Sequence, residues 1–535
     1  MANTFKKVID RLMWIQVPAS PNAHSAAMSM TSDLRNDTSR NPFTYQLSSN
    51  TVLNRYNIVT KGWSLVVSPA LAGTFGAGSA MTFAPSFGAV GTIAAGATTT
   101  SVVLSTALAT AVGTNMLANR GGSGDYGFKL RIIGFAAGKT EERYIVANTS
   151  GTTPTINVDL PFTFTPASGD RYEILAGRVF MLGAGTVASN IWKSFEVSTN
   201  TLATGLSTTG LPASIATDSD FVTLDEQYVP YTLVPGEGMI VGSGTYNSGS
   251  LNCLTATATG ASSLTGQSSG GDAVVASNEY RNFQIRIVED TGTPAAVGQR
   301  RIIASHTAGT SPVYTLGTAW STQPSSTAKY VIELPNLILL RTSGTTTVYT
   351  WNYTDASINN GTTTIASNAW STTYFGTAPA ANASGGVWAP SFGIVPDVAR
   401  NARQSFCYFF RGGATTLDVL DIAGGTTGNW TGNITYDGGV ALTTGTCGAY
   451  APFGSEGRMF YMNIYTASAI NQIFRFDVQN RVLSPYVPTD YLQSGTAAVG
   501  KRLAAYCAID GSDKYDVILL QAHLTAVNNE LIVLV

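Results

Sequence analysis

Beyond residue 50, short apolar runs alternate with clusters of glycine, serine, threonine, asparagine and aspartate. Apolar runs of about four to eight residues bounded by such clusters are typical of β-strands. A helical period, with apolar residues three and four positions apart, is missing from this part of the chain. The pattern therefore predicts an all-β protein made of many short strands.

The N-terminal segment follows a different pattern. Between Thr4 and Trp14 the apolar side chains recur at helical spacing. The residues of this stripe are Phe5, Val8, Ile9, Leu12 and Met13. The stretch that follows is polar, lacks a period and contains Pro21 and Pro42. We expect residues 1–50 to form a helix and an extended arm, with the apolar stripe of the helix docking on a partner.

Two stretches of the chain resemble each other. The run that begins at Arg143 (RYIVANTSGTTP) matches the run that begins at Arg301 (RIIASHTAGTSP), at an offset of 158 residues (301 − 143). Further pairs at this offset are Pro166 and Pro324, Tyr172 and Tyr330, and Ile174 and Ile332. A constant offset over such a span predicts that residues 95–175 and 245–332 are two copies of one small β-domain.

A shorter repeat recurs along the rest of the chain. Each copy has an apolar strand, a polar turn and then a triplet with an acid or amide between two apolar residues. The triplets are Tyr56-Asn57-Ile58, Phe195-Glu196-Val197, Trp351-Asn352-Tyr353, Leu420-Asp421-Ile422 and Phe476-Asp477-Val478. Meandering strands in modules of about 50 residues favour a β-propeller over a row of stacked sandwiches. We predict five or six blades, with the strand at residues 56–58 completing a blade begun by the C-terminal strands.

The two repeats together divide the chain into segments. The expected order is 1–50 helix and arm, 51–94 first propeller strands, 95–175 first inserted β-domain, 176–244 propeller blade, 245–332 second inserted β-domain, and 333–535 remaining blades. A signature of an aromatic residue, alanine and proline marks expected module starts at residues 83–85, 388–390 and 450–452, with a degenerate form at 228–230.

Composition narrows the range of partners. Charged residues make up only 12% of the chain, hydrophobic residues make up 44%, and the net charge is −2. This hydrophobicity excludes a disordered chain, and the near-neutral charge disfavours a protein that grips nucleic acid. A surface of threonine, serine and glycine suits a protein whose faces are covered by neighbours. The chain contains no stretch of about 18 apolar residues, so no membrane-spanning helix is predicted. Near Lys6 and Lys7, charged residues interrupt the apolar run that a signal peptide would need.

Cysteine and histidine spacing gives no metal pattern. Cys253, Cys407, Cys447 and Cys507 form no CxxC pair, and we expect them to be reduced, buried thiols. His24, His306 and His523 fall in different predicted modules, and a surface hydrogen bond is the expected role of His306.

One motif resembles a phosphate-binding loop. Residues 134–140 (GFAAGKT) are one residue too short for that loop, and a strand follows them where the loop would need a helix. The motif therefore predicts a β-turn.

A glycosidase needs a pair of carboxylates, and the candidates are Asp218, Asp220, Asp225 and Glu226, which cluster only in sequence. Their polar surroundings instead predict a solvated loop. The triplet acids Glu196, Asp421 and Asp477 recur once per module, so we expect them to accept turn N–H groups. We predict a protein that is not an enzyme, with no catalytic residue, cofactor, metal or small-molecule substrate.

The duplicated domain resembles modules of tailed-phage virion proteins. The resemblance is carried by Arg143, Thr149, Gly151, Pro154, Phe162, Pro166, Tyr172 and Ile174, and again by Arg301, Thr307, Gly309, Pro312, Trp320, Pro324, Tyr330 and Ile332. A propeller with inserted β-domains and an N-terminal arm is similar to the nozzle (tubular) proteins of short-tailed phages. This resemblance implies a homo-oligomeric ring, commonly hexameric, in a virion assembled in the bacterial cytoplasm. Such a ring passes DNA non-specifically at ejection and contacts adaptor and fibre proteins.

Three other classes fit parts of the same pattern. A trimeric receptor-binding fibre or spike also has β repeats with polar surfaces, but long fibres usually lack a propeller. A neck-collar or capsid decoration protein is a further alternative. A propeller depolymerase or sialidase needs arginines and carboxylates that converge on one propeller face. The arginines that recur, Arg131 with Arg286 and Arg143 with Arg301, belong instead to the inserted domains.

Overall fold

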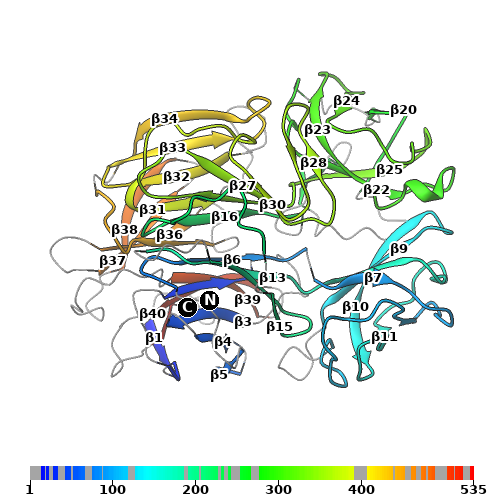
Figure 1. Ribbon diagram of the computed structural model, residues 1–535, viewed down its shortest axis with the longest axis horizontal. Coiled ribbons are helices and arrows are strands. Elements are labelled where there is room, and N and C mark those ends of the chain that lie inside the picture. The colour runs from blue at the N-terminus through cyan, green and yellow to red at the C-terminus, as the bar shows by residue number, and fades with distance from the viewer. Residues whose placement is uncertain are drawn as a thin grey trace, which may run out of the picture.

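The computed structural model is built almost entirely of β-strands (Figure 1). Among the residues described, one 3-10 turn at Pro294–Ala296 is the only helical element. The structure describes residues 14–18, 20–22, 28–33, 43–49, 52–58, 60–66, 75–86, 88–118, 127–185, 191–203, 206–226, 231–233, 239–241, 253–266, 276–390, 406–437, 440–451, 459–465, 471–477, 480–487, 503–510, 513–521 and 531–534. The all-β prediction is confirmed.

Six sheets of four antiparallel strands occur within these described residues. Blade 1 contains β2 (Ser29–Ser32), β3 (Phe43–Ser49), β4 (Val52–Asn57) and β5 (Gly62–Leu65). Blade 2 contains β6 (Ala80–Ala84), β13 (Arg178–Leu182), β14 (Trp192–Glu196) and β15 (Thr201–Ala203). Blade 3 contains β16 (Asp220–Leu224), β26 (Leu337–Arg341), β27 (Val348–Asn352) and β30 (Ala369–Ser371).

The second half of the propeller has the same design. Blade 4 contains β31 (Ala383–Pro390), β32 (Phe406–Gly412), β33 (Thr416–Asp421) and β34 (Asn429–Thr435). Blade 5 contains β35 (Cys447–Ala451), β36 (Met459–Tyr465), β37 (Asn471–Asp477) and β38 (Val482–Val487). Blade 6 contains β39 (Leu503–Asp510), β40 (Asp513–Gln521), β41 (Leu531–Leu534) and β1 (Trp14–Val17).

The first strand of each sheet lies innermost, and these strands form a closed ring. They contact one another in the order β2, β6, β16, β31, β35 and β39, and β39 contacts β2 again. Closure leaves no inner sheet edge exposed, which is the physical advantage of a propeller. The predicted propeller is confirmed, with six four-stranded blades in the described part of the chain.

Aromatic packing between the sheets stabilises the ring. The rings of Phe410 in blade 4 and Phe476 in blade 5 meet edge to face at 4.7 Å. Tyr408 also contacts Phe476, at 5.8 Å. Cys407, on the neighbouring position of β32, is buried as predicted, and burial raises the pKa of its thiol to about 12. Buried aromatic area of this kind supplies a large share of the stability of a β-protein.

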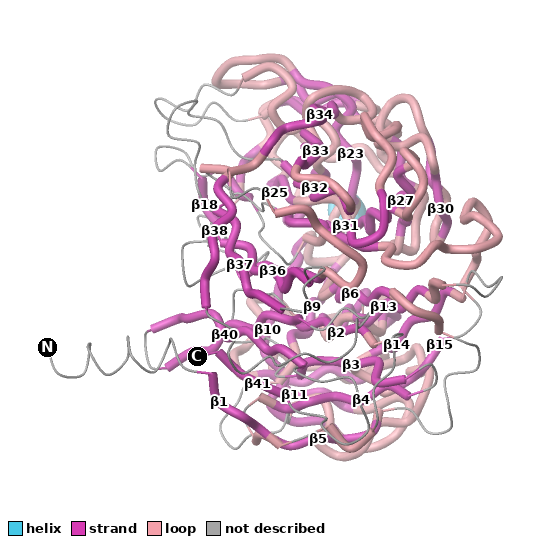
Figure 2. Tube along the Cα trace, turned by 90° about the vertical axis from the view of Figure 1, so that its left-hand side faces the viewer, coloured by secondary structure: helices cyan, strands magenta, loops and turns pink. Residues whose placement is uncertain are grey.

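The ring closes through a different strand from the one predicted. Figure 2 shows β1 beside β41, and Trp14 pairs with Leu534 in that register. Tyr56, which we expected to complete this blade, instead lies in β4 within blade 1. Joining the two ends of the chain in one blade is what closes the propeller ring here.

Three strands, β1 to β3, lie in the segment predicted to be a helix and an arm. The prediction failed because the polar side chains here are buried and satisfied by one another. The Ser20 hydroxyl donates to Gln46 at 3.0 Å, and the Asn54 amide donates to Ser48 at 2.6 Å. The predicted helix itself lies outside the described residues, apart from Trp14, which begins β1.

The first insertion joins two strands of blade 2, between β6 and β13. This domain, copy 1, contains β7 (Val90–Thr92), β8 (Ser101–Val103), β9 (Lys129–Gly134), β10 (Lys139–Asn148), β11 (Thr155–Val158) and β12 (Arg171–Leu175). The insertion begins right after Ala84, earlier than the predicted residue 95.

The second insertion joins two strands of blade 3, between β16 and β26. This domain, copy 2, contains β19 (Leu254–Thr255), β20 (Ala258–Gly260), β21 (Ser263–Thr265), β22 (Gln284–Glu289), β23 (Arg300–His306), β24 (Val313–Leu316) and β25 (Lys329–Glu333). Two small hairpins add β17 (Tyr231–Leu233) with β18 (Met239–Val241), and β28 (Ile358–Asn359) with β29 (Thr364–Ile365). In Figure 1 both copies lie to one side of the propeller, copy 1 in cyan and copy 2 in green.

The two copies share one backbone design. A register shift between Ile145 and Ala147 in β10 recurs between Ile303 and Ser305 in β23, at the predicted offset of 158 (303 − 145). Equivalent glycines adopt the same left-handed backbone, with φ of 120° at residues 151 and 309. Such a conformation favours glycine because it has no Cβ. The predicted duplication is therefore confirmed.

Candidate functional site

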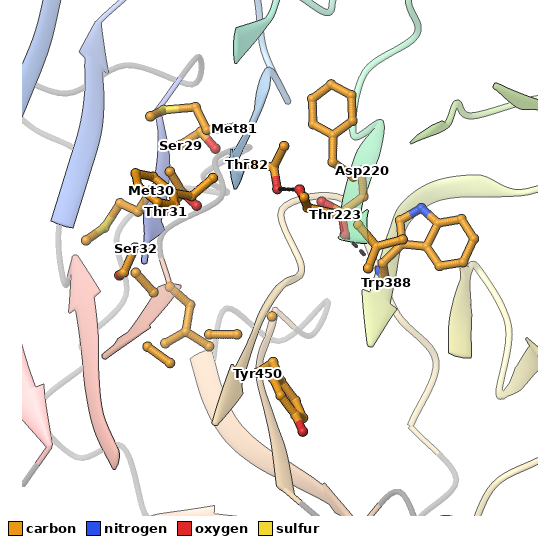
Figure 3. A pocket seen from close by; sticks show the side chains of 18 of the residues that line it. Ser29, Met30, Thr31, Ser32, Met81, Thr82, Asp220, Thr223, Trp388 and Tyr450 are labelled. Carbon is orange, nitrogen blue, oxygen red and sulfur yellow. Dashed lines mark hydrogen bonds between the residues drawn. The ribbon is translucent and has the colours of Figure 1, made fainter. Parts of the chain in front are cut away.

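A small cavity lies on the propeller axis, lined by the innermost strands of all six blades (Figure 3). Its volume is about 110 Å³. Pockets for small molecules usually measure about 300–1,000 Å³. In the described part of the chain, this axial cavity is therefore too small for a typical ligand or a nucleic-acid strand.

The lining of this axial cavity is mostly neutral. In its wall, the hydroxyls of Thr82 and Thr223 on the neighbouring strands β6 and β16 hydrogen-bond to each other at 2.5 Å. Asp220 is the single carboxylate among the described lining residues, and it accepts the backbone N–H of Trp388 at 2.8 Å. General acid–base hydrolysis of a glycoside needs two carboxyl groups facing one cleft. The axial cavity does not offer that pair.

The acidic run at residues 218–226 does not form the solvated loop that its polarity predicted. Asp218, Asp225 and Glu226 are fully buried. Asp218 accepts the backbone N–H of Gly445 at 3.1 Å. The prediction was wrong because each acid finds its partner in a segment far along the chain, and a local reading of polarity does not detect such partners.

Asp225 connects the bases of the two insertions. It follows β16, where copy 2 begins, and it accepts the N–H and the hydroxyl of Ser86, where copy 1 begins, at 3.0 and 2.8 Å. The Tyr353 hydroxyl donates to the same carboxylate oxygen at 2.7 Å. Three donors thus stabilise one oxygen of this buried carboxylate, and they hold the starts of the two insertions close to each other.

Glu226 begins a larger cluster of buried charges, the ion-pair joint. We define the joint by Arg131, Glu142, Glu173, Glu226, Gln284, Arg286, Arg300, Glu333 and Asn336. Its members come from copy 1, copy 2 and the ends of β16 and β26. The two copies also pair directly there, Lys139 of β10 with Glu289 of β22.

Arg131 is the centre of the joint. Its guanidinium lies 2.7 Å from Glu142, 2.8 Å from Glu173 and 2.5 Å from Glu226, and the side chain has no exposed surface. Arg300 of copy 2 reaches Glu226 at 2.9 Å and Glu173 at 3.3 Å. Two arginines from different copies thus share the same two carboxylates.

The remaining members extend the joint into copy 2. Arg286 pairs with Glu333 through two contacts of 2.9 and 3.0 Å. The Gln284 amide donates to both Glu226 and Glu333, at 3.2 and 3.1 Å. Asn336 accepts the backbone N–H of Glu226 at 3.0 Å, just before β26 returns to the propeller. Hydrogen bonds of this kind are what make buried charges tolerable.

The pKa shifts show how strongly the charges are coupled. Burial alone would raise the pKa of Glu173, but Arg300, Arg131 and Arg171 outweigh burial and lower it to about 2. Burial likewise opposes ionisation of Glu226, yet Arg131, Arg300 and Arg286 hold its pKa well below the usual range. Burial raises the pKa of Glu333 despite its pairing with Arg286. A glycosidase acid must keep a proton at working pH; Glu173 and Glu226 are held ionised, so they act as structural anions.

Two of the three triplet acids, Asp421 and Asp477, accept a turn N–H as predicted, whereas Glu196 does not. Asp421 accepts the N–H of Ala423 at 3.0 Å, and Asp477 accepts that of Asn480 at 3.0 Å, in the turn after the third blade strand. Glu196 instead accepts the hydroxyl of Ser198 at 2.8 Å and pairs with Arg178. A side-chain oxygen that accepts a turn N–H stabilises the turn locally.

Two further sequence-marked positions are structural. Residues 134–140 form the hairpin between β9 and β10, with Gly134 paired to Lys139, so the β-turn prediction is confirmed. His306 is buried, not at the surface as predicted. Its Nε2 accepts the N–H of Tyr280 at 2.8 Å and its Nδ1 faces the Thr307 carbonyl at 2.9 Å. Burial lowers the pKa of this imidazole.

The recurring arginines outside the joint also have matching structural roles. Arg143 donates to the Pro161 carbonyl and lies 5.2 Å from the Phe162 ring centre. Arg301, its equivalent in copy 2, donates to the Ala319 carbonyl and lies 5.5 Å from the Trp320 ring centre. Both therefore hold a loop of their own domain.

The proposed docking stripe lies outside the described residues. It comprises Phe5, Val8, Ile9, Leu12 and Met13. Within the described part of the chain, no helix is long and apolar enough to span a membrane. His24 and His523 are also outside the described residues.

The sequence contained one overlooked signal for the joint. At the offset of 158 residues (300 − 142), copy 1 has Glu142 where copy 2 has Arg300. A charge reversal between two otherwise similar copies is what complementary faces require. The other partners, such as Glu173 and Glu226, carry no such local mark.

Comparison with known proteins gives little beyond fold type. No known family matches the sequence, and no curated protein is significantly similar to it. The C-terminal WD40 domain of Sif2 is 9% identical, with 98% of each chain covered and a TM-score of 0.28. The tricorn protease is 10% identical, with 90% of this chain and 46% of that chain covered and a TM-score of 0.16. The six paired sheets of this chain themselves define it as a β-propeller with two inserted domains.

Proposed function

We propose that this protein is a structural component of a tailed-phage particle, several copies of which form a ring in the tail nozzle. The observation that carries the proposal is the ion-pair joint, which fastens two duplicated β-domains to a closed propeller. A joint of this kind suits a protein that works through the fixed position of its surfaces. In the described residues the candidate acids serve as structural anions, which supports an assembly role over catalysis.

The path for DNA lies between subunits in this proposal. Within the described residues, the cavity on the propeller axis measures about 110 Å³, which is too small to hold DNA. DNA would instead move through a channel that the subunits enclose together, and contacts there would be independent of sequence. The net charge of −2 suits passage better than tight binding, because tight binders neutralise many phosphates with basic residues.

Partner proteins would bind at two places. The stripe of Phe5, Val8, Ile9, Leu12 and Met13 is the proposed docking element for the adaptor above the ring. The inserted domains, which lie beside the propeller, would contact neighbouring subunits and fibres (Figure 1). A heterologous ring needs two different complementary faces on each subunit, and this asymmetric body provides them.

A receptor-binding fibre or spike is the main alternative, followed by a neck-collar or capsid decoration protein. A closed six-bladed ring in the described residues favours the nozzle over a long fibre, because fibres are built from elongated repeats. A spike could also have a propeller head, but it would be trimeric, so the symmetry of the assembly distinguishes it from a hexameric ring.

The test is the mass of the purified chain in solution, combined with class averages from negative-stain electron microscopy. The expected result is a hexameric ring with a central channel. A compact or elongated trimer would overturn the ring and favour the fibre or spike. A Leu12→Asp variant then tests the docking stripe: it should assemble like the wild type but lose binding to the adaptor protein.

A further inference from the structure

Blade 1 turns a polar face toward blade 6, although this face is buried. The opposite face packs on blade 2, where the Tyr45 ring centre lies 6.1 Å from that of Phe83 and 5.9 Å from that of Phe195. Side chains along a strand alternate between the two faces of its sheet, so Thr44 and Gln46, the neighbours of Tyr45 in β3, lie on the face toward blade 6. The inner strands β2 and β39 contact each other there. We call this contact between blades 6 and 1 the seam.

Hydroxyl and amide groups on this face of blade 1 bond to one another. Ser32 and Thr44, which are paired in the register of β2 and β3, share a hydrogen bond of 3.2 Å. The Ser48 hydroxyl donates to Gln46 at 3.1 Å, and the Asn54 amide donates to Ser48 at 2.6 Å. All five side chains are buried. Because these bonds lie within blade 1, they persist when water enters the seam, and water can then solvate the other polar atoms.

Other contacts between blades are aromatic. Between blades 2 and 3, the ring centre of Trp192 lies 5.5 Å from that of Trp351 and 5.1 Å from that of Trp370. Aromatic rings also meet between blades 4 and 5. Separating such rings exposes a large apolar area to water, whereas separating a polar face that is hydrogen-bonded within itself exposes little apolar area. Among these contacts, the seam is therefore the easiest to open.

One segment near the N-terminus holds both sides of the seam. Its strand β1 completes blade 6 by pairing with β41 along all four of its residues (Figure 2). Directly after β1, the Pro18 carbonyl accepts the indole N–H of Trp63, in the outer strand β5 of blade 1, at 2.8 Å. The Ser20 hydroxyl then donates to Gln46 of the same blade at 3.0 Å. We call β1 together with Pro18 and Ser20 the strap, because it is bonded to blade 6 at one end and to blade 1 at the other.

We propose that the propeller opens reversibly at the seam and that the strap controls this opening. When Pro18 separates from Trp63 and β1 separates from β41, blades 6 and 1 lose the segment that joins them, and the inner strands β2 and β39 move apart. Both strands line the axial cavity, β2 through Met30 and β39 through Ala504 and Ala505. The same opening therefore gives access to that cavity from the side. It takes place within one chain and does not depend on the proposed ring of subunits.

Native-state hydrogen exchange on the unmodified full chain, measured by mass spectrometry at low urea concentrations, tests the opening. The comparison is restricted to inner strands, which occupy the same position in every blade. The amides of β2 and β39 should exchange about tenfold or more faster than those of β6, β16 and β31, because a local opening needs less free energy than global unfolding. Equal exchange rates in all five strands would show that they open only together, and would overturn the proposal.

A pair of matched variants tests the strap. Trp63→Phe removes the N–H that bonds to Pro18 but keeps an aromatic ring beside Tyr56, so exchange of β2 and β39 should become about fivefold faster while the other inner strands stay unchanged. The control is Trp430→Phe, because the Trp430 indole also donates to a carbonyl at 2.8 Å, that of Phe375, but away from the seam. This control should leave β2 and β39 unchanged. No acceleration by Trp63→Phe, equal acceleration of all inner strands, or the same effect of both variants on β2 and β39 would overturn the role of the strap.

Discussion

Replacing Glu226 with glutamine tests whether the ion-pair joint stabilises the protein. Glutamine keeps the size and one acceptor oxygen, but it removes the charge that faces Arg131 at 2.5 Å and Arg300 at 2.9 Å. Breaking a buried ion pair on one side costs about 3–5 kcal/mol, because the partner charge stays buried without full compensation. Arg131 retains Glu142 and Glu173, so we expect a loss of about 3 kcal/mol in the free energy of unfolding, at the lower end of that range.

The assay is urea unfolding followed by tryptophan fluorescence, with hydrogen exchange to locate the effect. The loss of protection should concentrate in β9 and β22, which carry Arg131 and Arg286. The matched control is Asp355→Asn. Asp355 also ties copy 1 to the propeller, through Arg171 at 2.6 Å, but its side chain is 45% exposed. Exposed pairs contribute about 0–1 kcal/mol, so this variant should remain close to the wild type.

Equal stability losses for Glu226→Gln and Asp355→Asn would refute the reasoning. Such a result would mean that the desolvation of the charges cancels their attraction, as happens in some buried pairs. A large loss without any change in the protection of β9 and β22 would show that the effect acts elsewhere than at the joint.

Three further predictions concern pH and packing. The pKa of Glu173 is lowered from 4.5 to about 2, so its contribution to stability is present above pH 4.5 and is lost as the pH falls toward 2. In acid unfolding experiments, the stability of Glu173→Gln should therefore decline less over that pH range than the stability of the wild type. Burial lowers the pKa of His306 below 6.5, so the contribution of this residue to stability is lost as the pH falls below that value. The variant His306→Asn, which introduces the residue found in copy 1, should abolish this decline and leave the free energy of unfolding at pH 7.5 within about 1 kcal/mol of the wild type in urea titrations. A decline that persists in the variant would show that another group causes it. Gly317→Ala should lower the free energy of unfolding by about 1–3 kcal/mol, because the added Cβ meets the backbone of the β28–β29 hairpin. The control Gly113→Ala, whose Cβ would have nothing within 4 Å, should be neutral or slightly stabilising. Equal melting temperatures for both variants would contradict the close packing of the hairpin.

Local patterns in the sequence were enough to predict the propeller and its insertions. The triplet Leu420-Asp421-Ile422, for example, combines strand alternation with an acid that accepts an N–H of the next turn, so the signal lies within a few residues. The duplication was equally visible, because a constant offset preserves even the glycines at residues 151 and 309 that the backbone requires. Repeats of this kind report fold because every copy solves the same local problem.

The first blade escaped prediction for the opposite reason. In β3 the polar residues Gln46 and Ser48 are buried, and their partners, Ser20 and Asn54, lie on other segments. The polarity of this segment therefore predicted an extended arm, although β3 is a strand of blade 1. Likewise, β1 belongs to the last blade because it pairs with β41, more than 500 residues away along the chain (531 − 17).

The sequence by itself determined the strand pattern, the repeats and the turn chemistry, since each depends on neighbours within one module. Only the tertiary structure decided which charged residues are buried and with which partners they pair. Glu226 is separated from Arg131 by 95 residues and from Arg300 by 74, and no local pattern relates them. A carboxylate is costly to bury alone and stable when several guanidinium groups surround it. Whether an acid such as Glu226 ends in solvent or in a joint therefore depends on which distant segments the fold brings to it.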